Sequence, residues 1–281
     1  MEIEQLTSAT RQEAEHFLLG REDTSLFLLG NLETYGYQMG SEPYSGNFKL
    51  IRSSKGIVGV FCLTRCGNLL IQTDTRDFDP IFAACQEENI PIRGLLGEWG
   101  LCSEFWDYLK KKEIIKKEIF ASKEILYIAD LRIQRSILPQ VGARLLEIKD
   151  YDEWNVLSKE YLDEQKIPDG MSEKERQKLF AKLVKEKSAW GLFFEDRLAA
   201  KAELNAKAFD LAQVGGVFTA TGFRQRGLAK NLMLQLLYDV KNNLKLRKLI
   251  IFTGEENLPA RRLYESLGTH QAGRFSLLFG E

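Results

Sequence analysis

The segment that most restricts the fold is a strand, a short loop and a long amphipathic helix in direct succession. The helix is predicted over residues 226–242, where leucine or valine recurs at every fourth position from Leu228 to Val240. A stripe of this kind faces a core. The run LAQVGGVFTA before the loop and the run KLIIFT after the helix both read as strands. Together these elements predict an α/β fold.

The loop that opens this helix reads RQRGLAKNL, from Arg224 to Leu232. Gly227 has no Cβ, so a ligand could approach its backbone closely. The first amides of a helix lack partners within the helix and carry the positive end of its dipole. Arg224 and Arg226 add positive charge, and the small Ala229 keeps the first turn slim. The pattern therefore favours an anion site suited to a pyrophosphate; the alternative is an ordinary strand–helix turn with solvated arginines. The spacing fits neither GxxxxGK(S/T) nor GxGxxG.

At this point the chain resembles a known family. The segment GGVFTATGFRQRGLAKNL is similar to the acyl-CoA-binding motif of the GNAT superfamily of N-acetyltransferases, R/Q-x-x-G-x-G/A after a strand that ends in a valine–aromatic–small run. Its matching residues are Arg224, Gly227 and Ala229. The segment ENLPARRLYESLG resembles the second signature of the family, N-x-x-A-x-x-L-Y-x-x-x-G, at Asn257, Ala260, Leu263, Tyr264 and Gly268. The resemblance covers about residues 145–281.

The resemblance implies an α/β (α+β) fold with a mixed, centrally splayed β-sheet flanked by helices. It also implies an acyl-CoA-dependent N-acyltransferase, most simply one that moves acetyl from acetyl-CoA (CoA), its co-substrate, to a primary amine of a small molecule or peptide, with no metal. The implied cofactor-binding residues are the backbone of Val217, Phe218 and Thr219 for the pantetheine arm, the pyrophosphate loop of Arg224, Gln225, Arg226, Gly227, Leu228, Ala229 and Lys230, and Asn257 for the pantetheine.

Tyr264 is the implied catalytic residue, which would protonate the leaving thiolate; the alternative is a core tyrosine on an amphipathic helix. Asn257 has a simple helix cap as its alternative role. The general base stays unassigned. Some family members carry a glutamate on the splayed strand, and the residue here is Gln213, which cannot accept a proton. Glu203 and His270 are the other candidates.

With 281 residues, the chain suits two domains of about 130–150 residues each. We predict a first domain over residues 1–138 and a GNAT domain over 143–281. The first half lacks the R/Q-x-x-G-x-G/A motif. Its nearest counterpart is the glycine-rich RGLLGEWGLCSEFWDYL, in which the arginine-to-glycine spacing is wrong. We expect the first half to be a degenerate GNAT-like copy, with an unrelated α/β domain as the alternative.

The amino-acid composition limits which partners and which cellular compartment we expect for the protein. The 39 basic and 40 acidic residues nearly cancel, which gives no electrostatic case for nucleic-acid or membrane binding. Four cysteines without a CxxC pair, and two histidines, make a metal site unexpected. The N-terminus lacks the pattern of a signal peptide, so we expect a cytoplasmic protein, monomer or homodimer. Two other functions stay open: a non-catalytic CoA-binding regulatory or scaffold protein, and an aminoacyl-transfer enzyme of the double-domain type.

Overall fold

The computed structural model describes residues 1–133, 137–167 and 169–281. The contacts among these residues divide the chain into two compact units. Unit 1 consists of Met1–Leu126, Phe252–Glu256 and Gln271–Glu281, and unit 2 of Tyr127–Ile251 and Asn257–His270. The C-terminal end of the chain thus belongs to the same unit as its N-terminal part. The units therefore do not coincide with the halves 1–138 and 143–281, which stay a prediction for the domains.

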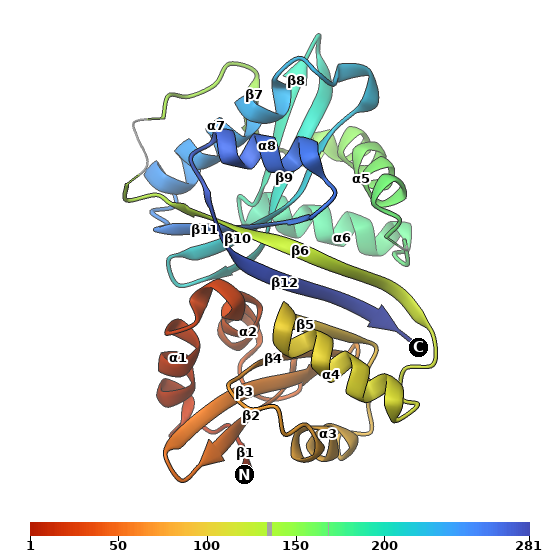
Figure 1. Ribbon diagram of the computed structural model, residues 1–281. Helices are drawn as coiled ribbons and strands as arrows, with labels where there is room; N and C mark the ends of the chain where they lie inside the picture. Colours follow the sequence, from red (N-terminus) through yellow and green to blue (C-terminus); the bar gives the residue numbers. More distant parts are fainter. Residues whose placement is uncertain (134–136, 168) are drawn as a thin grey trace. The chain divides into compact units, whose positions relative to one another are not determined.

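The N-terminal part of the chain alternates helices and strands (Figure 1). In chain order, its elements are β1 (Glu2–Gln5), α1 (Arg11–Leu19), α2 (Glu22–Tyr35), β2 (Gly46–Ser53), β3 (Gly56–Thr64), β4 (Asn68–Thr73), α3 (Asp79–Gln86), β5 (Gly94–Glu98), α4 (Trp99–Lys111) and β6 (Glu118–Asp130). Strands β2, β3 and β4 follow one another with short turns between them. The four-residue strand β1 was not expected from the sequence.

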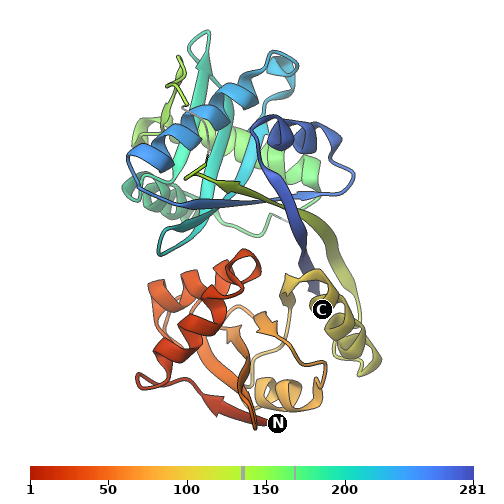
Figure 2. The same ribbon diagram turned by 60° about the vertical axis from the view of Figure 1, so that its left-hand side comes forward.

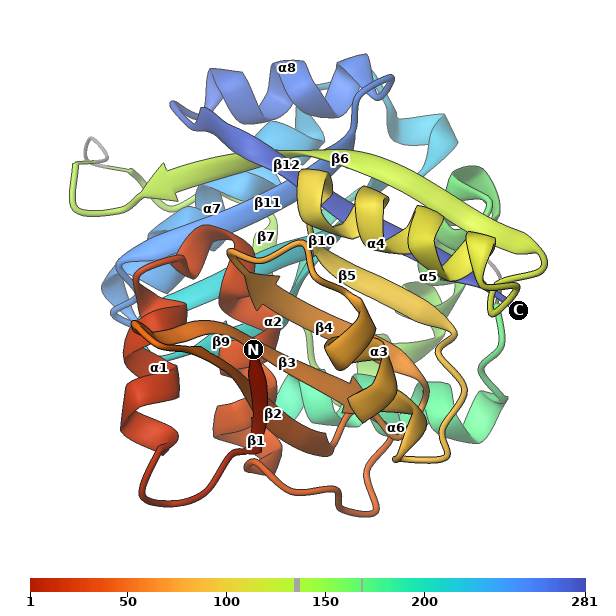
Figure 3. The same ribbon diagram turned by 60° about the horizontal axis from the view of Figure 1, so that its bottom comes forward.

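The sheet of unit 1 is mixed. Strands β1 to β4 pair antiparallel in sequence order, and β4 then pairs parallel with β5. The far side of β5 pairs antiparallel with the last strand of the chain, β12 (His270–Gly280), from Phe275↔Glu98 to Phe279↔Gly94. Figure 3 shows α3 and α4 over one face of this sheet and α1 and α2 behind it. Apolar residues of α3, α4 and the strands form one core there, which includes the stacked rings of Phe78 and Phe105.

Unit 2 holds the segment that resembles the GNAT motifs. In chain order, its elements are β7 (Ala143–Leu145), α5 (Tyr151–Gln165), α6 (Glu173–Lys185), β8 (Ala189–Phe194), β9 (Arg197–Ala208), β10 (Leu211–Thr219), α7 (Leu228–Asn242), β11 (Lys248–Gly254) and α8 (Leu258–Ser266), with short 3-10 helices at Ile148–Asp150 and Thr221–Phe223. The predicted amphipathic helix is confirmed as α7, whose leucine stripe is buried. Strand β7 ends at Leu145, and the 3-10 helix begins three residues later at Ile148.

The sheet of unit 2 is also mixed. Strands β7 to β10 pair antiparallel in sequence order, and β10 pairs parallel with β11. Helix α7 crosses one face of this sheet, and α5 and α6 cover the other (Figure 2). Trp154 of α5 and Phe180 of α6 pack together against β8 and β9 in the core of that second face. The sheet is therefore covered by helices on both faces, as the α/β prediction required.

The two parts of the chain repeat one order of elements: strand, two helices, three strands, helix, strand, helix, strand. In both, the three central strands are antiparallel, and the third of them continues through a helix into a parallel neighbour. This repetition confirms the predicted fold class, a GNAT-type α/β sheet with a second GNAT-like copy in the N-terminal half. Among the described residues, no helix is both long and apolar enough to cross a membrane.

Candidate active site

Strand β10 loses its parallel partner halfway along its length. Its register with β11 runs from Leu211↔Lys248 to Val214↔Ile251 and ends there. On its other side, β10 stays paired with β9 as far as Thr219↔Ala200. A register shift falls between Gly215 and Phe218, where Gly216 has a φ of +58°. On the side of β10 that faces β11, the backbone from Gly215 to Thr219 therefore has no partner strand. The predicted central splay of the sheet requires such an opening.

The loop after this edge exposes backbone at the start of α7. Gln225 and Gly227 have φ values of +63° and +75°, and Gly227 is the residue that precedes the first turn of the helix. A Cβ built on Gly227 would meet no atom within 4 Å. Within the described chain, no backbone carbonyl accepts a hydrogen bond from the amides of residues 225–229. These amides are free to hold an anion, as the first turn of a helix favours.

The arginines of the loop make different contacts. Arg224 donates from Nε to the carbonyl of Thr219 at 3.0 Å and from Nη2 to Glu164 of α5 at 2.5 Å. Its guanidinium also lies 5.3 Å from the ring centroid of Phe218. Arg226 lies 5.4 Å from the ring of Phe194 and is otherwise exposed. Arg224 therefore fastens the loop to β10 and α5, a structural role that the sequence did not predict.

Helix α8 carries the other two residues that the resemblance implied. The side-chain oxygen of Asn257 accepts a hydrogen bond from the Ala260 amide at 3.3 Å, which makes it the cap of this helix. Tyr264 is 4% exposed, and its ring centroid lies 5.8 Å from that of Tyr127. Because β10 and β11 run parallel, the loops into α7 and α8 follow the same edge of the sheet (Figure 1), where ligands of α/β sheets commonly bind.

Of the candidate bases, Glu203 has the most hydrogen bonds to other side chains. It lies on β9, is 8% exposed, and accepts hydrogen bonds at Oε1 from Trp154 Nε1 at 2.6 Å and from Lys201 Nζ at 2.7 Å. Gln213 is buried on β10 and donates to the Val214 carbonyl at 2.6 Å. His270 is exposed at the start of β12. Only alternation along AAKAEL could have indicated that Lys201 and Glu203 share one face.

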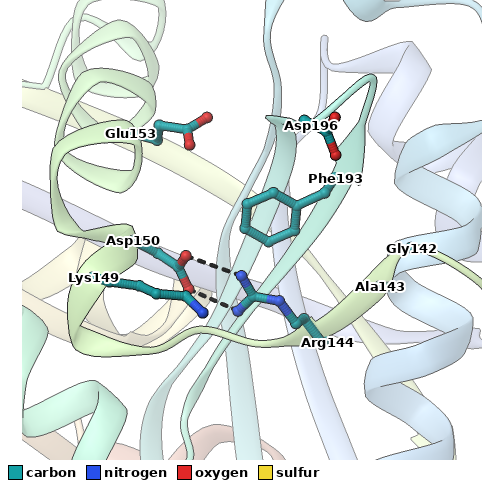
Figure 4. A pocket seen from close by; sticks show the side chains of 8 residues that line it. All are labelled: Gly142, Ala143, Arg144, Lys149, Asp150, Glu153, Phe193 and Asp196. Carbon is teal, nitrogen blue, oxygen red and sulfur yellow. Dashed lines mark hydrogen bonds and ion pairs between the residues drawn. The ribbon is translucent and has the colours of Figure 1, made fainter.

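Unit 2 also has a surface pocket of 640 Å³, which none of these residues lines (Figure 4). It is lined by Gly142, Ala143, Arg144, Lys149, Asp150, Glu153, Phe193 and Asp196. Arg144 donates two hydrogen bonds to Asp150, at 2.7 and 2.9 Å, and its guanidinium lies 4.2 Å from the ring of Phe193. The Glu153 carboxylate accepts from the Leu198 amide at 2.6 Å. Arg144 and Asp150 are thus already paired with each other, and none of the predicted site residues lines this pocket.

The N-terminal copy has a different turn at the position that corresponds to the α7 loop. Helix α3 follows β4 as α7 follows β10, but it begins with Asp79 and Pro80 and has no bare glycine there. Asp79 accepts hydrogen bonds from the Tyr108 hydroxyl at 2.6 Å, and its pKa is lowered by this bond and by Lys112, which lies 3.4 Å away. A carboxylate at this helix end would repel a phosphate. The glycine-rich turn of RGLLGEWG instead leads into α4, the counterpart of α8, where Glu98 caps the helix.

The fold and the paired motifs are those expected of the GNAT superfamily, and comparison with known proteins matches one part of the chain to this family. The sequence model of the Acetyltransferase (GNAT) family matches residues 152–269, so this part of the chain is a GNAT domain. The family generally uses acetyl-CoA as co-substrate and acts on amines. A search of curated proteins gave no match.

Solved structures extend the likeness to the whole chain. A GNAT acetyltransferase from Colwellia psychrerythraea is 14% identical with a TM-score of 0.55, and 100% of both chains is covered. A Drosophila protein is 14% identical with a TM-score of 0.71, over 99% of this chain and 98% of that one. A tandem GNAT protein from the clavulanic acid biosynthesis pathway is 12% identical with a TM-score of 0.58, over 99% and 97%. At these identities the likeness concerns the fold alone.

Proposed function

We propose that the protein transfers an acetyl group from acetyl-CoA to a primary amine of a small molecule or peptide. The observation that carries this proposal is the succession of two features along one strand and its loop. The β10 edge loses β11 after Val214, and the bare N-terminus of α7 follows at Gly227. An extended ligand with a pyrophosphate at one end matches both.

Each half of the site supplies one kind of interaction. The backbone of Val217, Phe218 and Thr219 would bind the pantetheine arm as an added strand does, with its amides and carbonyls. The amides from Gln225 to Ala229 would hold the pyrophosphate, with support from the helix dipole. Because Arg224 is already paired with Glu164, its charge would contribute less than that of the exposed Arg226 and Lys230.

The chemistry that follows is attack of a neutral amine on the thioester carbonyl. A backbone amide of the unpaired β10 segment, at Phe218 or Thr219, would stabilise the oxyanion that forms. Tyr264 would give its proton to the departing thiolate. Tyr264 is buried on α8, which supports this role because a buried side chain keeps its position relative to the group that it protonates. Positioning of both reactants would contribute much of the rate enhancement.

Thiol release from acetyl-CoA in the presence of a panel of primary amines and peptides tests the proposal. We expect at least one amine to release CoA faster than water does, and the Gly227→Glu variant to lose this activity. Acetyl-CoA binding without turnover on any amine would instead favour a non-catalytic CoA-binding protein. If wild-type protein shows neither binding nor thiol release, the proposed function is wrong.

A further inference from the structure

A buried ion pair lies beside the shifted register of β10. Lys201 and Glu203 are two residues apart on β9, so their side chains lie on one face, and both side chains are nearly buried, at 3% and 11% exposed. The register pairs Gly215 with Glu203 and Phe218 with Lys201, so the two charges flank the residues where the shift occurs. A Cβ on Gly216 would lie 3.1 Å from Lys201 Nζ and 3.4 Å from Glu203 Oε2. The pair therefore faces the backbone that has lost β11.

The two oxygens of Glu203 have different surroundings. Oε1 accepts both recorded hydrogen bonds, from Trp154 and from Lys201. No donor in the described part of the chain reaches Oε2, which is the oxygen nearest the Gly216 position. The carboxylate is thus held rigidly by one oxygen, while the other is turned toward the edge of β10. Oε2 therefore keeps its capacity to accept a hydrogen bond.

Aromatic rings from α5 complete the surroundings of the pair. Lys201 Nζ lies 5.7 Å from the ring of Trp154 and 5.5 Å from that of Tyr161. The Tyr161 ring meets the Phe218 ring edge-on at 6.1 Å. A cation is favoured over such faces. An apolar pair of similar volume would usually stabilise a core as well as a buried ion pair does, so stability alone is a weak reason for these charges.

We propose that Glu203 is the general base of the reaction: its Oε2 binds the acceptor's ammonium and takes one proton from it. This rests on the proposed acetyl transfer. The proton moves from the ammonium to Glu203, and the nitrogen lone pair then forms the C–N bond to the thioester carbonyl. The C–S bond breaks as the intermediate collapses, the thiolate takes the proton of Tyr264, and the second nitrogen proton re-protonates the tyrosinate. Glu203 releases its proton to water.

The other candidates fit this role less well. Gln213 occupies the strand position where some relatives carry a glutamate, and its amide cannot accept a proton. Its amide nitrogen already donates to the Val214 carbonyl. His270 is exposed at the start of β12 and has no recorded contact with the β10 edge. Glu203 alone combines a carboxylate with a position against the shifted register.

Lys201 is a positioning residue in this account. Lys201 and the indole of Trp154 both donate to Oε1 of Glu203, so together they fix the direction in which the carboxylate points. The titratable groups recorded around the carboxylate in the described residues are Lys201 on its own strand and, across Lys201, Tyr161 on α5.

Three variants and one control test the proposal with the best amine of the panel. Glu203→Gln keeps the hydrogen-bond shape of the side chain but leaves Lys201 unpaired. The double variant Glu203→Gln/Lys201→Met removes both charges and restores the neutrality of the site. Lys201→Met alone keeps the carboxylate. Glu195→Gln, at an exposed turn residue before the same strand, is the control.

We expect both variants that lack the carboxylate to bind acetyl-CoA normally and to lose kcat/KM by about 10²–10⁴-fold at pH 7, the range for a positioned base. Their loss should shrink at high pH, where the amine is already neutral. Lys201→Met keeps the carboxylate and removes one of its two anchors, so kcat/KM should fall less than in the two variants that lack the carboxylate, with acetyl-CoA affinity unchanged. If the double variant regains stability and also wild-type turnover, Glu203 is structural and the proposal is wrong. If wild-type protein binds no acetyl-CoA, the proposed function is wrong, and this inference, which depends on it, is wrong as well.

Discussion

A single charge placed at Gly227 should remove cofactor binding while leaving the protein folded. The residue has a φ of +75° and open space around its Cβ position, so Gly227→Glu creates no clash in the free protein. The strain of a side chain in the left-handed region is about 1–2 kcal/mol. Each kcal/mol lowers the melting temperature of a domain of about 150–250 residues by about 2–4 °C. The variant should therefore fold, with a melting temperature a few degrees below that of the wild-type protein.

Acetyl-CoA affinity should fall much more. The new carboxylate would stand where a phosphate is expected, and two unit charges about 4 Å apart repel by about 1 kcal/mol in water and about 4 kcal/mol near a protein surface. Since about 1.4 kcal/mol is tenfold, the dissociation constant should rise about 5- to 1,000-fold for each phosphate charge. Calorimetry with acetyl-CoA measures this rise.

Gly222→Glu is the matched control for this experiment. Gly222 lies in the same loop, and a Cβ there also meets nothing within 4 Å, but its φ is not positive. It precedes the exposed amides of residues 225–229, so its charge should weaken binding only a few-fold by repulsion across solvent. An unchanged affinity in the folded Gly227 variant, or an equal loss in the Gly222 variant, would refute the placement of the pyrophosphate.

Three further predictions concern side chains whose surroundings are defined. Tyr264→Phe should lower turnover about 10²–10⁴-fold with little change in acetyl-CoA affinity, because a proton donor is lost but the buried ring remains; a normal rate with a lower melting point would make Tyr264 a packing residue. Asn257→Ala should cost about 0.5–2 kcal/mol in the free energy of unfolding, because the Ala260 amide loses its cap, and denaturant titration measures this. Glu124 is buried beside Ser122, and burial raises its pKa above 4.5. Because the folded state then binds more protons than the unfolded state, stability falls as the pH rises through the window above 4.5, so Glu124→Gln should raise the melting temperature at pH 7 and flatten this dependence.

Local patterns predicted the elements around the cofactor loop because each has a local cause. The stripe from Leu228 to Val240 fixes α7, and Asn257 with Gly268 fixes the ends of α8. In the tight turn between β8 and β9, Glu195 and Asp196 both have positive φ. The strand β1 was missed because EIEQ is short and shows little apolar alternation.

Long-range features were beyond such patterns. Nothing in the sequence of β12 indicates that it pairs with β5, about 180 residues earlier in the chain. The shift at Gly216 is visible only once β9 and β10 are in register. The sequence named Glu203 as one candidate base beside His270, but its burial and its pairing with Lys201 follow from the packing of α5 over β9, which brings in Trp154. The choice between the candidate bases therefore needed the structure, while the phosphate loop was predicted from the sequence.

The most direct test of the account is the number of acetyl-CoA molecules that one chain binds. Unit 2 has a bare helix start at Gly227, whereas the corresponding helix of unit 1 begins with Asp79. Isothermal titration calorimetry should therefore give one site per chain. At a ligand concentration 100 times the dissociation constant, the free energy of unfolding should rise by about 2.7 kcal/mol. No heat and no shift at millimolar acetyl-CoA, or two equivalent sites per chain, would contradict the account.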